Sequence, residues 1–156
     1  MILLYVGIGL ILIIMIVMIV LQVRKDKIIQ STKDTIKQTL KTYGKLTQED
    51  RHLFMRLGTV EFEILFFYVP TNAELTINSK TMWEVRDSTQ SRLYNQTHFL
   101  ASTKPKIVIV FPTVQKIKRY INENEMEFVS CHKMFYNMYI VKLEEVTHLL
   151  EVLKDA

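Results

Sequence analysis

The sequence predicts an α/β fold, with an α+β arrangement as the alternative, carried behind a single N-terminal transmembrane helix. The first 23 residues contain no charged side chain, and all 20 Lys and Arg and all 16 Asp and Glu lie from Arg24 onward. From there, β-branched runs alternate with amphipathic stretches, which is typical of a mixed sheet with helices packed against it. Residues 24–156 suffice for a stalk and one small domain, but not for two domains.

Composition excludes several classes of protein. Hydrophobic residues make up 49% and charged residues 23% of the chain, which is an ordinary globular composition and argues against disorder. A single Cys excludes a disulfide framework and multi-cysteine metal sites. Outside the apolar start the only glycines are Gly44 and Gly58, and no phosphate-binding glycine motif is present. We therefore favour a role other than catalysis and expect no cofactor, apart from Mg²⁺ under the alternative given below.

Residues 1–23 form the predicted membrane anchor. The run from Ile2 to Val23 is apolar apart from Gln22 and two glycines. As a helix it would span roughly 32 Å, close to the ~30 Å hydrocarbon core of a bilayer. A cleaved signal peptide is the alternative, but it would have basic residues before a shorter apolar run and a small-residue cleavage site after it. Here the basic residues follow the run, which favours an uncleaved signal-anchor.

The basic residues also predict the orientation. Six of them follow the apolar run closely, and none precedes it: Arg24, Lys25, Lys27, Lys33, Lys37 and Lys41. Basic flanks remain on the cytoplasmic side. We therefore expect a single-pass protein of the cell membrane with its N-terminus outside and its domain in the cytoplasm.

Residues 24–45 predict a basic juxtamembrane helix. Ile29, Ile36, Leu40 and Tyr43 recur at helical spacing, and Gly44 stands where a glycine commonly ends a helix. The six basic residues named above occupy the other faces. Each would be attracted to anionic headgroups by about 1 kcal/mol when close to the surface. The lipid bilayer is therefore the first expected partner.

Residues 46–156 form the predicted cytoplasmic domain. Thr47 to Asp50 has the form of a capping box, which predicts a helix over 48–57 that ends at Gly58. Residues 59–69 predict a strand whose start, at Glu61 and Glu63, is solvated. Two short strands, 73–78 and 81–87, would form a hairpin, and 88–100 carries an imperfect helical stripe.

The second half of the domain continues the alternation. The β-branched run 106–112 is typical of a central strand that is covered on both faces. Val114, Ile117 and Ile121 predict a helix over 113–122. Two strands are expected at 126–132 and 138–141, and an amphipathic helix at 143–154.

One group of side chains is a candidate for a catalytic site. The four His and one Cys are scattered without metal-ligand spacing, so we expect no metal site built from them. Glu74 and Glu84 fall on the two strands expected to pair, and Arg86 lies two residues after Glu84 on the same face. The simplest interpretation of this group is a cross-strand ion pair on a solvated face, which would stabilise the domain by a few tenths of a kcal/mol.

The same residues also carry a resemblance. The element order over residues 47–121, with an acid on one strand and an E-x-basic pair on the next, is similar to the restriction-endonuclease-like nucleases, including their membrane-anchored relatives. The resemblance implies that Glu74 and Glu84 hold Mg²⁺ and that the basic residue helps to activate water. That basic residue is Lys in the family and Arg86 here, and Arg keeps its proton near neutral pH.

Two hypotheses for function follow. The first is a single-pass membrane protein that presents a cytoplasmic interaction or scaffolding domain to another protein. The alternative is a membrane-tethered nuclease-like domain, active or inactive, that uses Glu74, Glu84 and Arg86 with Mg²⁺. A nucleic-acid partner is not expected, since the basic cluster at Lys116 to Arg119 is followed at once by Glu123, Glu125 and Glu127.

Overall fold

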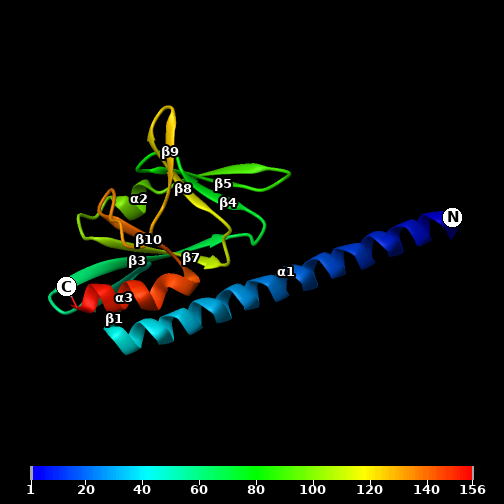
Figure 1. The fold of residues 1–156 in the computed structure, drawn as a ribbon. Coiled ribbons are helices and arrows are strands. Elements are labelled where there is room, and N and C mark those ends of the chain that lie inside the picture. The colour runs from blue at the N-terminus through cyan, green and yellow to red at the C-terminus, as the bar shows by residue number, and fades with distance from the viewer. Residues whose placement is uncertain (1, 156) are drawn as a thin grey trace. The chain divides into compact units, whose positions relative to one another are not determined.

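The fold class predicted from the sequence is confirmed by the computed structural model, which describes residues 2–155 and the side chains from Gly7 to Asp155. A long apolar helix precedes two mixed five-stranded sheets and short helices. The chain divides into two compact units, Met1–Ile36 and Lys37–Ala156. Figure 1 shows the second unit as layers, with one sheet above the other and the C-terminal helix on the far side of the lower sheet.

The helices and strands have the following bounds: α1 Ile2–Tyr43, β1 Lys45–Glu49, β2 His52–Leu57, β3 Val60–Val69, β4 Glu74–Ile77, β5 Met82–Arg86, β6 Ser91–Asn95, α2 Thr97–Leu100, β7 Lys106–Pro112, β8 Ile117–Asn122, β9 Glu125–Phe128, β10 Met138–Lys142, the short 3-10 helix η1 Leu143–Glu145, and α3 Val146–Asp155.

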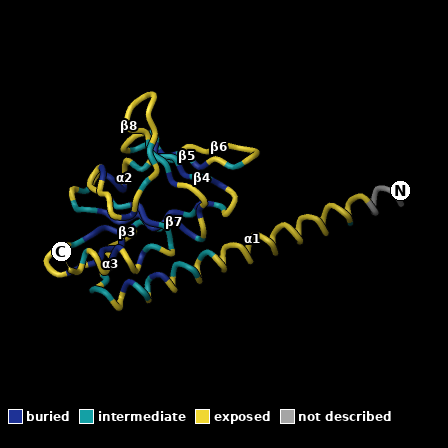
Figure 2. The backbone as a smooth tube through the Cα atoms, viewed as in Figure 1, coloured by how far each residue is buried: buried dark blue, intermediate teal, exposed yellow. Residues whose placement is uncertain are grey.

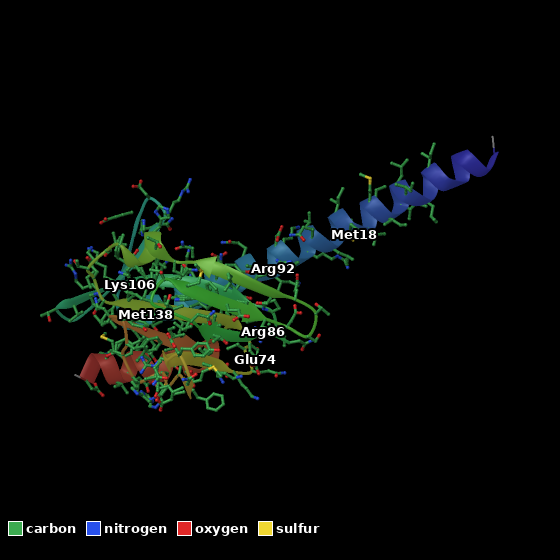
Figure 3. The ribbon with its side chains drawn as sticks, turned by 90° about the horizontal axis from the view of Figure 1, so that it is seen from above. Met18, Glu74, Arg86, Arg92, Lys106 and Met138 are labelled. Atoms are coloured by element: carbon green, nitrogen blue, oxygen red, sulfur yellow. The ribbon has the colours of Figure 1, made fainter. Side chains whose placement is uncertain are left out.

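Helix α1 merges the predicted anchor and stalk into one uninterrupted helix. Its large apolar side chains from Ile8 to Val23 are 46–65% exposed, and Met18 is seen to project from the helix in Figure 3. Soluble monomeric proteins rarely expose a contiguous apolar surface of this length. Within the described residues, α1 is the one helix long and apolar enough to cross a membrane.

Helix α1 ends at Tyr43, directly before Gly44 as predicted, and this end is built into the second unit. The Gly44 N–H donates to the Leu40 carbonyl at 3.1 Å, and Leu40 itself is fully buried. A Cβ at Gly44 would lie 2.3 Å from the carbonyl oxygen of Arg56 on β2. Glycine is required here because the helix end and strand β2 approach so closely. The Tyr43 hydroxyl donates to Glu151 of α3 at 3.4 Å.

Sheet A has the order β1-β2-β3-β7-β10 and holds the most buried strand of the domain. Strands β3, β7 and β10 are parallel, whereas β1 and β2 join β3 as antiparallel neighbours. Residues Lys106 to Phe111 of β7 are all buried, which confirms the predicted central strand. Figure 2 shows this buried stretch between layers that are exposed on their outer sides.

Sheet B has the order β6-β5-β4-β8-β9 and packs its inner face against sheet A. The layer between the sheets contains Phe67 of β3, Val108 and Val110 of β7, and Trp83 of β5. Trp83 is fully buried, with its indole N–H donating to the Lys80 carbonyl at 3.2 Å. The hairpin predicted for β4 and β5 is confirmed.

The helix predicted over 48–57 is wrong. Strands β1 and β2 occupy the segment and form a hairpin, and Asp50 adopts a left-handed φ of 52° in its turn. Leu53, Phe54 and Met55 are all buried, because β2 is covered on both faces and pairs on both edges. Pairing with β3 outweighs the local capping signal, as tertiary context commonly does.

The helix predicted over 113–122 is also wrong. Residues 117–122 form β8, which lies between β4 and β9. Val114 and Ile117 are buried as expected, but Ile121 is 49% exposed.

The helical stripe in 88–100 is likewise interrupted, because β6 pairs with β5 and only the four-residue α2 is helical. The C-terminal helix is confirmed, with Val146, Leu149 and Leu150 buried.

The expected solvation of Glu63 is wrong too, since this residue forms a buried ion pair. Glu63 is 1% and Lys106 2% exposed, and they lie directly opposite each other on β3 and β7. The Lys106 ammonium donates to Glu63 at 3.1 Å and to the carbonyls of Ser102 and Lys104 at 2.9 Å each. His52 Nδ1 lies 2.5 Å from the other Glu63 oxygen. All three ammonium donors are therefore satisfied.

Replacing Lys106 with Met should leave the Glu63 carboxylate buried without its cation and lower the free energy of unfolding by about 3–5 kcal/mol. Adding Glu63→Leu should recover much of this loss, because an apolar pair removes both charges together. The measurement is urea unfolding of the full chain in neutral detergent, followed by the fluorescence of Trp83.

Lys104→Met provides the matched control for this prediction. The Lys104–Glu61 pair is 41% and 29% exposed at its two side chains, so its loss should cost less than about 1 kcal/mol. Equal losses for the Lys104 and Lys106 variants, or a double variant no better than Lys106→Met alone, would contradict the structural role given to the buried pair.

Candidate functional site

The outer face of sheet B, which points away from sheet A, is the candidate functional surface. The strand register places one row of side chains across all five strands of this face. That row consists of Leu93, Glu84, Thr76, Lys118 and Phe128. It has apolar residues at both ends and charged residues in the middle.

The predicted group of Glu74, Glu84 and Arg86 lies on this face. Glu74 and Arg86 are opposite each other on β4 and β5, while Glu84 is opposite Thr76. The labels in Figure 3 show Glu74 and Arg86 close together at one end of the domain. Both carboxylates, with Arg86 and Lys118, line a small cavity of about 100 Å³. The hairpin therefore brings together the three residues that the sequence singled out.

Each carboxylate in this group already has a cationic partner. Lys118 donates to Glu74 at 2.6 Å, and the Lys116 ammonium lies 3.8 Å from the other Glu74 oxygen. Arg86 contacts Glu84 at 2.7 Å. The hydrogen bond from Lys118 holds the pKa of Glu74 below its ordinary value. The pKa of Glu84 is also lowered, first by the hydrogen bond from the Ser91 hydroxyl and then by Arg86.

The arrangement favours ionised, paired carboxylates over a metal centre. Among the residues that the structure describes, no group of three or more His, Cys, Asp and Glu side chains is placed to hold a metal ion. Cys131 is buried, and burial raises the pKa of its thiol. A thiol that keeps its proton is a poor nucleophile.

The apolar ends of the face are features that sequence analysis missed. On β9, Met126 is 51% and Phe128 68% exposed, and on β6 Leu93 is 63% exposed. Apolar residues of a half-buried strand commonly face the core. Instead Glu127 binds Arg119 and Lys133, and the apolar residues are turned to the outside.

A second, larger cavity lies at the ends of β4 and β8. It measures about 430 Å³, and its lining includes Asn78, Tyr120, Ile121, Glu123 and Tyr136. The pairing of β8 with β9 shifts register between Tyr120 and Asn122, and such bulges redirect side chains near the ends of strands. The carbonyl oxygen of Asn78 is buried without a hydrogen-bond partner among the described residues, while its amide donates to Glu84 at 3.4 Å.

Comparisons with protein-family models, with curated protein sequences and with solved structures found no match to this chain.

Proposed function

We propose that this chain is a single-pass membrane protein whose domain binds another protein through the outer face of sheet B. The observation that carries the proposal is the set of exposed apolar side chains on this face, Leu93, Met126 and Phe128, around a centre of paired charges. Several large apolar side chains exposed on one face are typical of protein interaction surfaces. Affinity would come from the apolar ends, while the charged centre would set the register of the partner.

The proposed orientation places the N-terminus outside and the domain in the cytoplasm. Arg24, Lys25 and Lys27 follow the apolar part of α1 directly, so they would lie at the level of the headgroups. Lys33 comes ten residues after Val23 on the same helix, or about 15 Å along its axis. For a helix that crosses close to the bilayer normal, this exceeds the Debye length of about 8 Å. The first three basic residues therefore determine orientation more strongly than the later ones.

Replacing Arg24, Lys25 and Lys27 together with Gln should produce a mixture of both orientations, because the charge difference across the helix is lost next to the bilayer. Protease accessibility of the domain in sealed membrane vesicles measures this. The matched control replaces Lys33, Lys37 and Lys41 with Gln and should change the orientation less. An unchanged orientation in the first variant would remove the charge argument for a cytoplasmic domain.

A protein partner on the outer face of sheet B can be detected by photo-crosslinking. With p-benzoylphenylalanine in place of Phe128 or Leu93, irradiation of the intact membrane should give an adduct of one defined mass, since both side chains project from the proposed contact surface. The same probe in place of Glu49, an exposed residue of β1 on sheet A, should not give that adduct. Identical patterns at all three positions would contradict a specific surface.

The shared cavity of Glu74 and Glu84 favours a second candidate, the Mg²⁺-dependent nuclease-like domain. Under that candidate Mg²⁺ or Mn²⁺ at 100 times its dissociation constant should add about 2.7 kcal/mol to the free energy of unfolding. Because Lys118 and Arg86 already pair with the carboxylates, we expect neither metal to raise the thermal unfolding midpoint. A rise that Glu84→Ala abolishes would favour the nuclease candidate over the interaction domain.

A further inference from the structure

The larger cavity, at the ends of β4 and β8, suggests what kind of partner the domain takes. Two tyrosine rings border it, with Tyr120 36% and Tyr136 42% exposed. Its lining also contains the exposed carboxylate Glu123, and it contains no basic residue. Within the described residues, Glu123 makes no ion pair, whereas the carboxylates of the smaller cavity are paired with Lys118 and Arg86.

The charge and the aromatic residues in the lining of this cavity both favour a cationic ligand. A carboxylate attracts a cation, and the faces of tyrosine rings attract cations through their quadrupoles by about 0.5–1 kcal/mol at exposed sites. The hydroxyl oxygens of the two tyrosines in the lining can also accept hydrogen bonds from a cationic donor. An anionic ligand would find neither a basic side chain nor a helix N-terminus here.

The β8–β9 hairpin extends this surface beyond the cavity. The hairpin projects from the domain in Figure 1, and it exposes Ile121, Met126 and Phe128 by 49%, 51% and 68%. Its tip carries Glu123 and Glu125, which make no ion pair among the described residues, whereas Glu127 is paired with Arg119 and Lys133. The hairpin thus combines exposed apolar area with negative charge, which is complementary to a partner that is apolar and basic.

We propose that the cavity between the β8–β9 hairpin and Tyr136 binds an arginine side chain of a protein partner, with the partner's neighbouring apolar residues against Ile121 and Met126. Arginine is favoured over lysine because its planar guanidinium both stacks on aromatic rings and pairs with carboxylates. This inference rests on the proposed function, since it specifies the chemistry of the partner that the domain would bind.

The test uses the full chain in nanodiscs of phosphatidylcholine, which carry no net charge to attract a basic peptide. The probes are the peptide acetyl-Leu-Arg-Leu-amide and its counterpart with citrulline, which keeps the shape of arginine but is neutral. We expect the arginine peptide to bind about tenfold more tightly by calorimetry. In protein labelled with fluorotyrosine, the ¹⁹F resonances of Tyr120 and Tyr136 should shift, and that of Tyr68 on β3 should not.

Two variants test the cavity itself. Glu123→Gln should weaken binding of the arginine peptide about two- to fivefold, while the matched control Glu49→Gln on β1 should leave it unchanged. Tyr136→Asn removes the ring at a position with φ of 50°, a left-handed conformation that Asn tolerates, so the fold is kept while binding falls.

The possible failures are distinguishable. Equal binding of the arginine and citrulline peptides, or binding that Glu123→Gln and Tyr136→Asn do not change, would overturn the cavity's role. If the photo-adduct at Phe128 then persists, the proposed function stands without this inference. Absence of that adduct when Phe128 carries the photo-probe and Glu123 and Tyr136 are both unchanged would overturn the proposed function and the inference with it.

Discussion

The buried ion pair between Glu63 and Lys106 is the interaction on which the rest of the domain depends. It lies where β3 and β7 run in parallel, and the same ammonium binds the carbonyls of Ser102 and Lys104 in the loop before β7. The Lys106 N–H donates to the Asn137 carbonyl, and the Asn137 amide donates to Thr103, each at 3.0 Å. The segment that carries Tyr136 is therefore fastened to the end of sheet A, so one wall of the larger cavity depends on the order of the core.

The pairing of charges across neighbouring strands explains why the domain has no basic face despite its many lysines. Lys104 binds Glu61, Lys118 binds Glu74, and Arg119 binds Glu127, each from an adjacent strand or the loop beside it. Half-exposed pairs of this kind add little stability but cancel the local field. At the tip of the β8–β9 hairpin, Glu123 and Glu125 make no ion pair among the described residues, and these two carboxylates are the basis of the proposed basic partner.

Sequence patterns correctly predicted the elements that are apolar on both faces or apolar on one face only. Strand β7 is apolar on both faces and α3 on one, so composition alone located them. Strand β8 failed because Val114, Ile117 and Ile121 happen to repeat at helical spacing, while its pairing with β4 brings together residues more than forty positions apart. The burial of Glu63 could have been inferred from one pattern. Glu61 and Glu63 are two residues apart, as are Lys104 and Lys106, and this equal spacing lets two ion pairs form between the segments. No such pattern indicates the outward orientation of Met126 and Phe128, because alternation fixes a strand's period but not which face meets the core.

The length of helix α1 bears on how tightly the domain would have to bind a partner in the same membrane. Helix α1 continues to Tyr43, and Gly44 alone lies between its last residue and β1. The 20 residues of α1 after Val23 extend at most about 30 Å, so in the proposed arrangement the second unit stays close to the bilayer. Confinement of two proteins to one membrane raises their effective concentration toward the millimolar range, as a short linker does. A contact made of one arginine-sized cavity and a few exposed apolar side chains, weak in solution, would then be sufficient for a partner in the same membrane.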